Sequence, residues 1–166
     1  GQTIACVALL AALCSATVMR AQDWRSAVSL AKAATEAAPT SPRAWIDLCV
    51  GYLAQGGGVE NPNNPRLDDA IAACASGADA NSDSLNNLAV LIALKTRRGD
   101  IGAADWERFQ QRLGAAPMSW DNIRAPLVLT HYASLGVPVD KVQVLAAFAT
   151  LEGRVELKPS TLAQMG

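Results

Sequence analysis

Charged and aromatic residues are both scarce in this chain of 166 residues, at 17% and 5%. Soluble domains usually contain about 25% charged residues, and the charges here nearly cancel, giving a formal net charge of −1. A nucleic-acid-binding protein needs a surplus of Lys and Arg to neutralise phosphates, so this class is excluded. A disordered chain is excluded as well, because 51% of the residues are hydrophobic. The scarcity of aromatic and β-branched residues argues against an all-β fold.

The residue patterns of common catalytic and metal sites are also missing. The single histidine, His131, is not accompanied by a recognisable Ser or Cys nucleophile, and we interpret it as a partly buried structural residue. Without a CxxC pair, one histidine does not make a zinc site. The glycine-rich stretch 56–66 lacks the Lys and Ser or Thr of a phosphate-binding loop. Asp68, Asp69 and Asp121 suit helix starts, so we expect no catalytic residue, no metal and no cofactor.

Alanine is the residue that the chain has in excess, at 32 positions. It is the best helix former, and its small side chain lets neighbouring helices approach closely. Apolar residues recur at helical spacing between breaks made of Gly and Pro, which predicts an all-α fold. The expected helices cover residues 23–38, 43–55, 67–78, a stretch capped by Ser82 or Asp83 and ending at Arg98, and residues 103–113, 121–135 and 139–152.

The first nineteen residues carry no charge, and Arg20 is the first charged residue. At about 1.5 Å per residue, such a helix is roughly 28 Å long, close to the thickness of a bilayer's hydrocarbon core. We therefore expect residues 1–20 to form a transmembrane helix. A signal segment and a buried core helix stay open as alternatives. The start at Gly1 rather than Met suggests a piece of a longer protein that has further membrane helices upstream.

Helix pairs at this spacing prompt a search for internal repeats. Residues 44–56, AWIDLCVGYLAQG, resemble the first helix of a tetratricopeptide (TPR) repeat, and residues 85–100 carry the same pattern again. Residues 23–39 and 67–78 have small residues at the spacing of the second helix of such a repeat. In that family, small residues let the two helices touch, while the larger ones fill the groove towards the next pair.

The resemblance implies an α-solenoid of TPR-like antiparallel helix pairs over residues 21–153. The remaining residues, 154–166, would be the start of a further helix or a tail. Two features depart from the family pattern: about ten residues are inserted after Gly56, and the last helix pair lacks most of the signature residues.

The junction between the apolar segment and the first repeat-like helix is similar to that of bacterial O-mannosyltransferase-like membrane glycosyltransferases, which carry TPR repeats after their last transmembrane helix. This resemblance covers residues 4–56 and implies a bacterial inner-membrane protein whose soluble part is periplasmic. It also implies a non-catalytic interaction or scaffold domain that brings a protein partner or a glycan acceptor to a membrane transferase or polymerase. A free-standing TPR assembly factor for secretion, pilus or polysaccharide export is the alternative.

TPR arrays bind partners in a concave groove lined by the first helix of each pair, so the resemblance implies a protein or peptide partner there. In the family, an Asn in this groove commonly hydrogen-bonds an extended peptide backbone. A plain polar surface role for Asn86 and Asn87 stays open. The residues expected to face the groove are Arg43, Ile46, Asp47, Val50, Asn86, Asn87 and Val90.

The four cysteines fall into two pairs. Cys6 and Cys14 belong to the apolar segment, and we interpret them as small residues of a lipid-facing or packed helix. Cys49 and Cys74 fall on the inner faces of the two helices of one repeat, where packing can bring their Cα atoms within the about 4.4–6.8 Å that a disulfide needs. In an oxidising compartment, such a bond would close a loop of about 25 residues and contribute about 3 kcal/mol. Two buried free thiols are the alternative.

Overall fold

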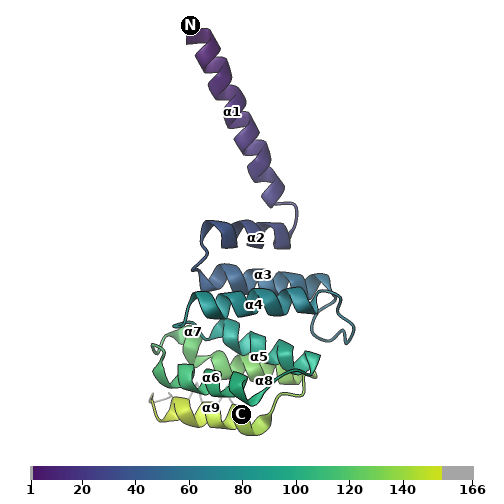
Figure 1. The fold of residues 1–166 in the computed structure, drawn as a ribbon, viewed down its shortest axis with the longest axis vertical. Helices are drawn as coiled ribbons and strands as arrows, with labels where there is room; N and C mark the ends of the chain where they lie inside the picture. Colours follow the sequence, from purple (N-terminus) through teal and green to yellow (C-terminus); the bar gives the residue numbers. More distant parts are fainter. Residues whose placement is uncertain (1, 155–166) are drawn as a thin grey trace.

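The structure, a computed structural model, describes residues 2–154 and contains no strand in that range (Figure 1). The predicted all-α class is therefore confirmed. Residues 155–166, which hold most of the predicted tail, lie outside the described residues. The described helices are α1 Gln2–Asp23, α2 Ala27–Ala37, α3 Pro42–Gln55, α4 Leu67–Ala80, α5 Asn86–Arg98, α6 Ala103–Ala115, α7 Trp120–Ile123, α8 Ala125–Ser134 and α9 Lys141–Glu152.

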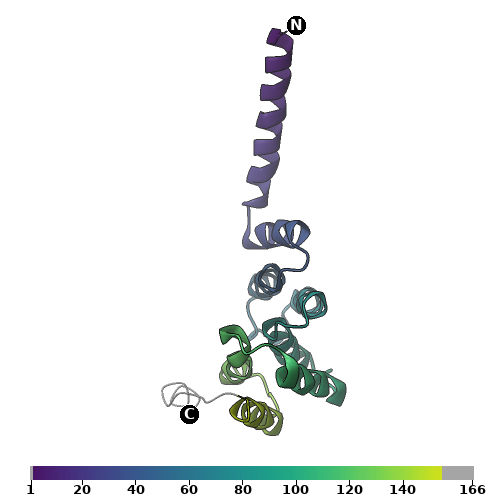
Figure 2. The ribbon, with the colours of Figure 1, turned by 90° about the vertical axis from the view of Figure 1, so that its left-hand side faces the viewer.

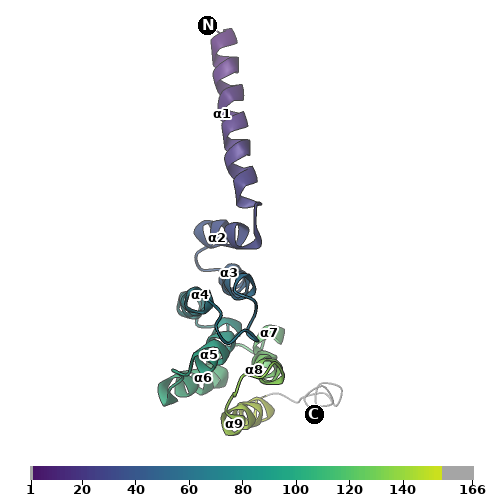
Figure 3. The same ribbon diagram turned by 90° about the vertical axis from the view of Figure 1, so that its right-hand side faces the viewer.

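Helix α1 projects from the other helices as a single rod, which is clearest in Figures 2 and 3. Its apolar side chains face solvent, with exposed fractions of 77% for Ile4, 62% for Leu10 and 56% for Leu13. The alternative of a buried core helix is therefore wrong. The prediction of a transmembrane helix over residues 1–20 finds no support either: within the described part of the chain, no helix is long and apolar enough to cross a membrane.

The boundary between α1 and α2 differs from the predicted one. The sequence predicts one helix over residues 23–38 with Trp24 on its buried stripe, whereas α2 begins only at Ala27 and Trp24 is 70% exposed. Ser26 is the N-cap of α2. Its Oγ accepts a hydrogen bond from the Ser29 N–H at 3.0 Å, and the Ser29 Oγ accepts one from the Ser26 N–H at 3.0 Å. This capping box fixes the start of α2.

Helices α2, α3, α4 and α5 pack in chain order, each against the next (Figure 1). Small residues set their separation: a Cβ added at Gly77 of α4 would lie 2.5 Å from the Trp45 Cβ of α3. The same two helices are joined by a disulfide between Cys49 and Cys74, whose Cα atoms are 5.4 Å apart and whose side chains are fully buried. The predicted pairing of these two cysteines is present.

The connection between α3 and α4 is a loop, as its glycines, prolines and asparagines predict. The buried Asn64 organises it, because its Nδ2 donates to the carbonyls of Leu53, at 2.9 Å, and Gly58, at 2.8 Å. Gly57 and Gly58 have φ values of 94° and 81°, which only glycine adopts without strain. The insertion is therefore a folded loop held by its own polar side chains.

Helix α5 lies at the centre of the array and packs against α3, α4, α6 and α8. Its start differs from the predicted cap at Ser82 or Asp83: Leu85 precedes the first turn, and its N–H donates to Asn122 Oδ1 at 2.9 Å. Helix α6 packs mainly against α9, and α8 contacts both α5 and α9.

The predicted helix over residues 121–135 is divided into α7 and α8 at Arg124. Proline has no N–H to donate, so Pro126 removes one helical hydrogen bond at this point. Ser119 caps the first piece, because its Oγ accepts from the Asn122 N–H at 3.3 Å. Arg124 keeps right-handed helical angles, φ −85° and ψ −7°, so the chain continues to wind through the break.

Candidate partner-binding groove

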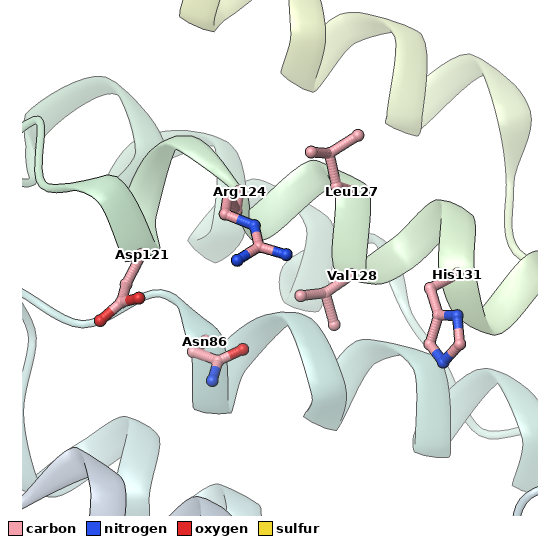
Figure 4. Close-up of a pocket in the computed structure, with 6 residues that line it drawn as sticks. All are labelled: Asn86, Asp121, Arg124, Leu127, Val128 and His131. Carbon is pink, nitrogen blue, oxygen red and sulfur yellow. The ribbon is translucent and has the colours of Figure 1, made fainter. Parts of the chain in front are cut away.

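Two adjoining hollows run across α3, the start of α5, α7 and α8. The first, of about 320 Å³, lies between α3 and the start of α5, and the second, of about 310 Å³, lies between α5 and the α7–α8 segment (Figure 4). Asn86 and Asp121 line both, and the two neighbouring hollows together are called here the α3–α8 groove. Its lining residues are Pro42, Arg43, Ile46, Asp47, Ser84, Asn86, Asp121, Arg124, Leu127, Val128 and His131.

The α3 wall of the groove contains three of the residues predicted from the TPR resemblance. Arg43 and Asp47 are one helical turn apart and form an exposed ion pair, with 3.6 Å between Nε and Oδ2. Ile46 lies between them in sequence and is only 8% exposed, so it forms an apolar floor. Asn86, from the start of α5, is the fourth predicted residue that lines the groove. Whether these residues bind a partner stays a prediction.

The other three predicted residues do not line the groove. Asn87 is fully buried, and its Nδ2 donates to the Pro42 carbonyl at 2.8 Å, which ties α5 to the start of α3. Val90 is also buried in the core, at 4% exposure, while Val50 is exposed but lies outside both hollows. Neighbouring residues of a helix point about 100° apart, so Asn86 faces the groove and Asn87 the core.

Residues from α7 and α8 form the opposite wall, and sequence reasoning missed them because this helix pair lacks the repeat's signature residues. In Figure 4, Asp121, Arg124, Val128 and His131 follow one another along the α7–α8 segment, with Asn86 of α5 facing them. Asp121 lies in the first turn of α7, as its interpretation as a helix-start residue predicts, and it also lines the groove. His131 is exposed, so its interpretation as a partly buried residue is wrong. The four residues that follow one another along this wall, from Asp121 to His131, are three, four and three positions apart, which is typical of one helix face. This spacing was the signal in the sequence that could have identified the wall.

The buried Asn122 holds this wall in position. Its Oδ1 accepts from the Leu85 N–H at 2.9 Å, and its Nδ2 donates to the Asp83 carbonyl at 2.6 Å and the Pro117 carbonyl at 2.9 Å. These bonds join the start of α7 to the turn before α5, and the bond from Asn87 to the Pro42 carbonyl joins α5 to α3, so the two asparagines together hold the groove walls in place. A site built on such fixed elements loses less conformational entropy when it binds a partner.

The groove carries charges of both signs. The Arg124 guanidinium lies over the Trp120 ring, 5.8 Å from its centroid. His131 contacts Tyr132 edge to face, with the ring centroids 5.9 Å apart, and burial raises the pKa of the Tyr132 hydroxyl. Among the described residues, no group of three His, Cys, Asp or Glu side chains is placed to hold a metal ion. This combination of amide, paired charges and apolar side chains suits reversible binding of a polar chain.

Two of the three basic residues near the end of α5 face acidic partners, and the third, Arg97, donates to the Glu60 carbonyl at 3.1 Å. Lys95 Nζ contacts Asp105 Oδ2 at 2.6 Å, and Arg98 contacts both Asp68, at 2.7 Å, and Asp100. These contacts raise the pKa of the Arg98 guanidinium, and Arg98 in turn lowers the pKa of Asp100. This end of the array is therefore an ion-pair cluster with balanced charge, which leaves the α3–α8 groove as the stronger candidate site.

No family model, no curated protein and no solved structure matches this chain. The resemblance to TPR domains and to membrane glycosyltransferases therefore still rests on the sequence patterns alone.

Proposed function

We propose that this chain is a non-catalytic interaction domain, whose helical array binds a segment of a protein or peptide partner in the α3–α8 groove. The observation that carries the proposal is that two neighbouring hollows lie across α3, α5, α7 and α8 and share Asn86 and Asp121 in their linings. A groove of this length fits an elongated ligand better than a compact one.

The groove offers the two kinds of contact that a peptide needs. Asn86 has an amide that both donates and accepts hydrogen bonds, as a peptide backbone does. Ile46, in the floor of the groove beside α3, and Val128, on the α7–α8 wall, offer apolar surface for side chains. Leu127 also belongs to the lining, but it points away from Asn86 in Figure 4. Apolar contacts supply affinity while a few polar groups set orientation, which is the usual division in binding sites.

The proposal includes attachment to a membrane through α1 and a periplasmic location. Helix α1 has no charged residue before Arg20 and exposes apolar side chains over residues 4–19, which favours an apolar environment, since exposed apolar patches of this kind mark attachment surfaces. The buried bond between Cys49 and Cys74 supports an oxidising compartment, where disulfides persist. By the sequence resemblance, the partner protein would be a glycan-handling transferase or polymerase, or a glycan acceptor brought to it.

A peptide-display selection on the folded, oxidised chain tests the groove. We expect enriched peptides whose binding weakens in the Asn86→Ala and Val128→Ala variants. Val142→Ala is the matched control, because Val142 of α9 is 72% exposed and lies outside the groove. If selected peptides bound all variants equally, or if no peptide were enriched, the proposed function would be wrong.

Co-sedimentation with phosphatidylethanolamine–phosphatidylglycerol vesicles tests the attachment separately. We expect the chain to sediment with the vesicles, and Leu10→Asp to release it, because a charge in the middle of α1 is costly in an apolar environment. Leu145→Asp is the control, since Leu145 of α9 is equally apolar and 67% exposed. Equal sedimentation of both variants would contradict attachment through α1.

A further inference from the structure

Four side chains form a row along one wall of the α3–α8 groove: Asp121, Arg124, Val128 and His131 (Figure 4). Helical hydrogen bonds continue through the break between α7 and α8, since the Arg124 N–H donates to the Trp120 carbonyl at 3.3 Å and the Val128 N–H donates to the Arg124 carbonyl at 3.1 Å. Residues three or four apart on such a helical surface have Cβ atoms about 5–6 Å apart. The row is therefore a line of evenly spaced groups.

The groups in this row differ in charge along its length. It begins with the carboxylate of Asp121, continues with the guanidinium of Arg124, and then becomes apolar at Val128. Within the described chain, no ion pair or hydrogen bond engages the side chain of Asp121, and the contact of Arg124 is with the face of Trp120. Both charged groups thus keep their hydrogen-bonding capacity for a ligand. On the facing α3 wall, Arg43 and Asp47 neutralise each other.

An extended peptide has nearly the same spacing on one side. Each residue of a strand rises by about 3.3 Å and side chains alternate between faces, so every second side chain points the same way at intervals of about 6.6 Å. This interval is close to the spacing of the row. Consecutive same-side residues of a bound peptide can therefore face consecutive members of the row.

We propose that the groove recognises an extended segment with an acidic residue at the centre and a basic and an apolar residue two positions away on either side. The basic side chain pairs with Asp121, the acidic one with Arg124 and the apolar one packs on Val128. The amide of Asn86, across the groove, is placed to hydrogen-bond the peptide backbone. This inference rests on the proposed function and adds the chemical identity of the bound segment.

The same row disfavours simpler ligands. An isolated anion, such as a phosphate group, would gain from Arg124 but would be repelled by Asp121 one turn away. A purely basic segment would meet the opposite conflict. Only a ligand that alternates in charge satisfies both groups, and the order of charges then determines which peptides are excluded.

Four five-residue peptides, acetylated and amidated at their ends, test the order of charges by NMR titration of the oxidised chain up to millimolar concentration. Lys-Thr-Glu-Thr-Leu and Leu-Thr-Glu-Thr-Lys carry the proposed pattern in both chain directions. Glu-Thr-Lys-Thr-Leu and Leu-Thr-Lys-Thr-Glu have the same composition with the charges exchanged. The exchanged peptides replace two attractive ion pairs, at Asp121 and Arg124, with two repulsions between like charges. We therefore expect at least one of the first two peptides to bind about tenfold more tightly than either exchanged peptide.

A charge-reversed variant, Asp121→Arg with Arg124→Asp, provides the matched control. It keeps the net charge and changes only exposed side chains, so its circular dichroism spectrum and unfolding midpoint should stay close to those of the native chain. We expect this variant to prefer the exchanged peptides. Reversal of the preference would support the inference.

Equal binding of all four peptides, or no binding of any of them, would overturn the proposed charge pattern. The display selection distinguishes this result from failure of the proposed function. Peptides of another pattern that bind in the groove would leave the function standing, whereas an unsuccessful selection would remove both.

Discussion

Helices α1 and α5 contain long apolar stretches, but their surroundings are opposite. In α1, every residue from 4 to 19 is exposed. In α5, the eight consecutive residues 87–94 are buried, and five of the eight are fully covered. The less polar of the two sequences is therefore the one in solvent, because α1 has no charge over residues 1–19 while α5 ends with Lys95, Arg97 and Arg98.

The difference arises from neighbours rather than from composition. Helix α5 has α3, α4, α6 and α8 around it, and its charged end lies at the edge of the array, where basic groups favour a helix C-terminus. Helix α1 has its main contact with α2 and projects away from the rest of the array (Figures 2 and 3). Burial of an apolar side chain contributes to folding only where other elements cover it, so α1 adds little to the stability of the array.

Matched leucine truncations give the largest expected contrast. Leu94 in α5 is fully buried and Leu10 in α1 is 62% exposed. Leu94→Ala should lower the free energy of unfolding by about 2–5 kcal/mol, because it removes buried surface and leaves a cavity. Leu10→Ala should stay within about 0.5 kcal/mol. Urea unfolding followed by circular dichroism measures both, and similar costs would mean that α1 is packed in solution.

The two cysteine pairs allow the same comparison between α1 and the packed helices, because only the pair in α3 and α4 forms a covalent bond. Replacing both Cys49 and Cys74 with Ala should lower the free energy of unfolding by about 3 kcal/mol, because the bond that closes their loop is lost. Replacing both Cys6 and Cys14 with Ser should change it little, since both are exposed in α1. Urea unfolding without reductant measures the two double variants. A stable chain without the Cys49–Cys74 bond would show that packing alone holds α3 and α4 together.

Alanine substitutions at two glycines test how closely the helices around α5 pack against one another. At Gly77 an added Cβ would lie 2.6 Å from the Asn87 side chain of α5, whereas at Gly114 of α6 nothing lies within 4 Å. Gly77→Ala should destabilise by about 1–3 kcal/mol through overpacking. Gly114→Ala should stabilise by about 0.5–1 kcal/mol through helix propensity. Thermal unfolding checks the signs, and a stabilising Gly77→Ala would mean that α4 and α5 are more loosely packed.

The charged end of α5 gives the smallest expected effect, and it depends on pH. The hydrogen bond from Arg98 lowers the folded-state pKa of Asp100, so the stabilisation is complete above the ordinary Asp pKa of about 3.9 and is lost as the pH falls through the lower folded-state value. Because the pair is partly exposed, Asp100→Asn should cost less than about 1 kcal/mol at pH 7, and less again in high salt. Urea midpoints at pH 7 and pH 2.5 measure this.

Glu107→Gln, on the exposed side of α6, is the control for this pH series. If Asp100→Asn lost as much stability at pH 2.5 as at pH 7, the ion pair with Arg98 would not be the cause.

Much of the helical array was predictable, because its signals are local. Pro39 and the glycines at 56–58 separate α2, α3 and the loop, and Gly99 ends α5 with a φ of 89°. The predicted pairing of Cys49 and Cys74 came from placing each on the inner face of its helix. The break at Arg124 was not predicted, because a proline near a helix start is often tolerated.

The candidate groove was only half predictable. The α3 residues Arg43, Ile46 and Asp47, together with Asn86, were predicted from the resemblance to TPR repeats, in which the first helix of each pair lines the groove. The α7–α8 wall comes from a region without that pattern, and its position depends on Asn122, whose bonds to Leu85 and Asp83 span 37 and 39 residues. Sequence spacing carries no information about such distant partners.

The sequence by itself determined the all-α class and the approximate helix boundaries, because backbone propensity and hydrophobic spacing act within a few residues. Only the tertiary structure decided which apolar helix is covered, which of Asn86 and Asn87 faces the groove, and which residues join Asp121 there. Burial and site geometry depend on the positions of other helices, and these positions are set by contacts between residues far apart in the chain.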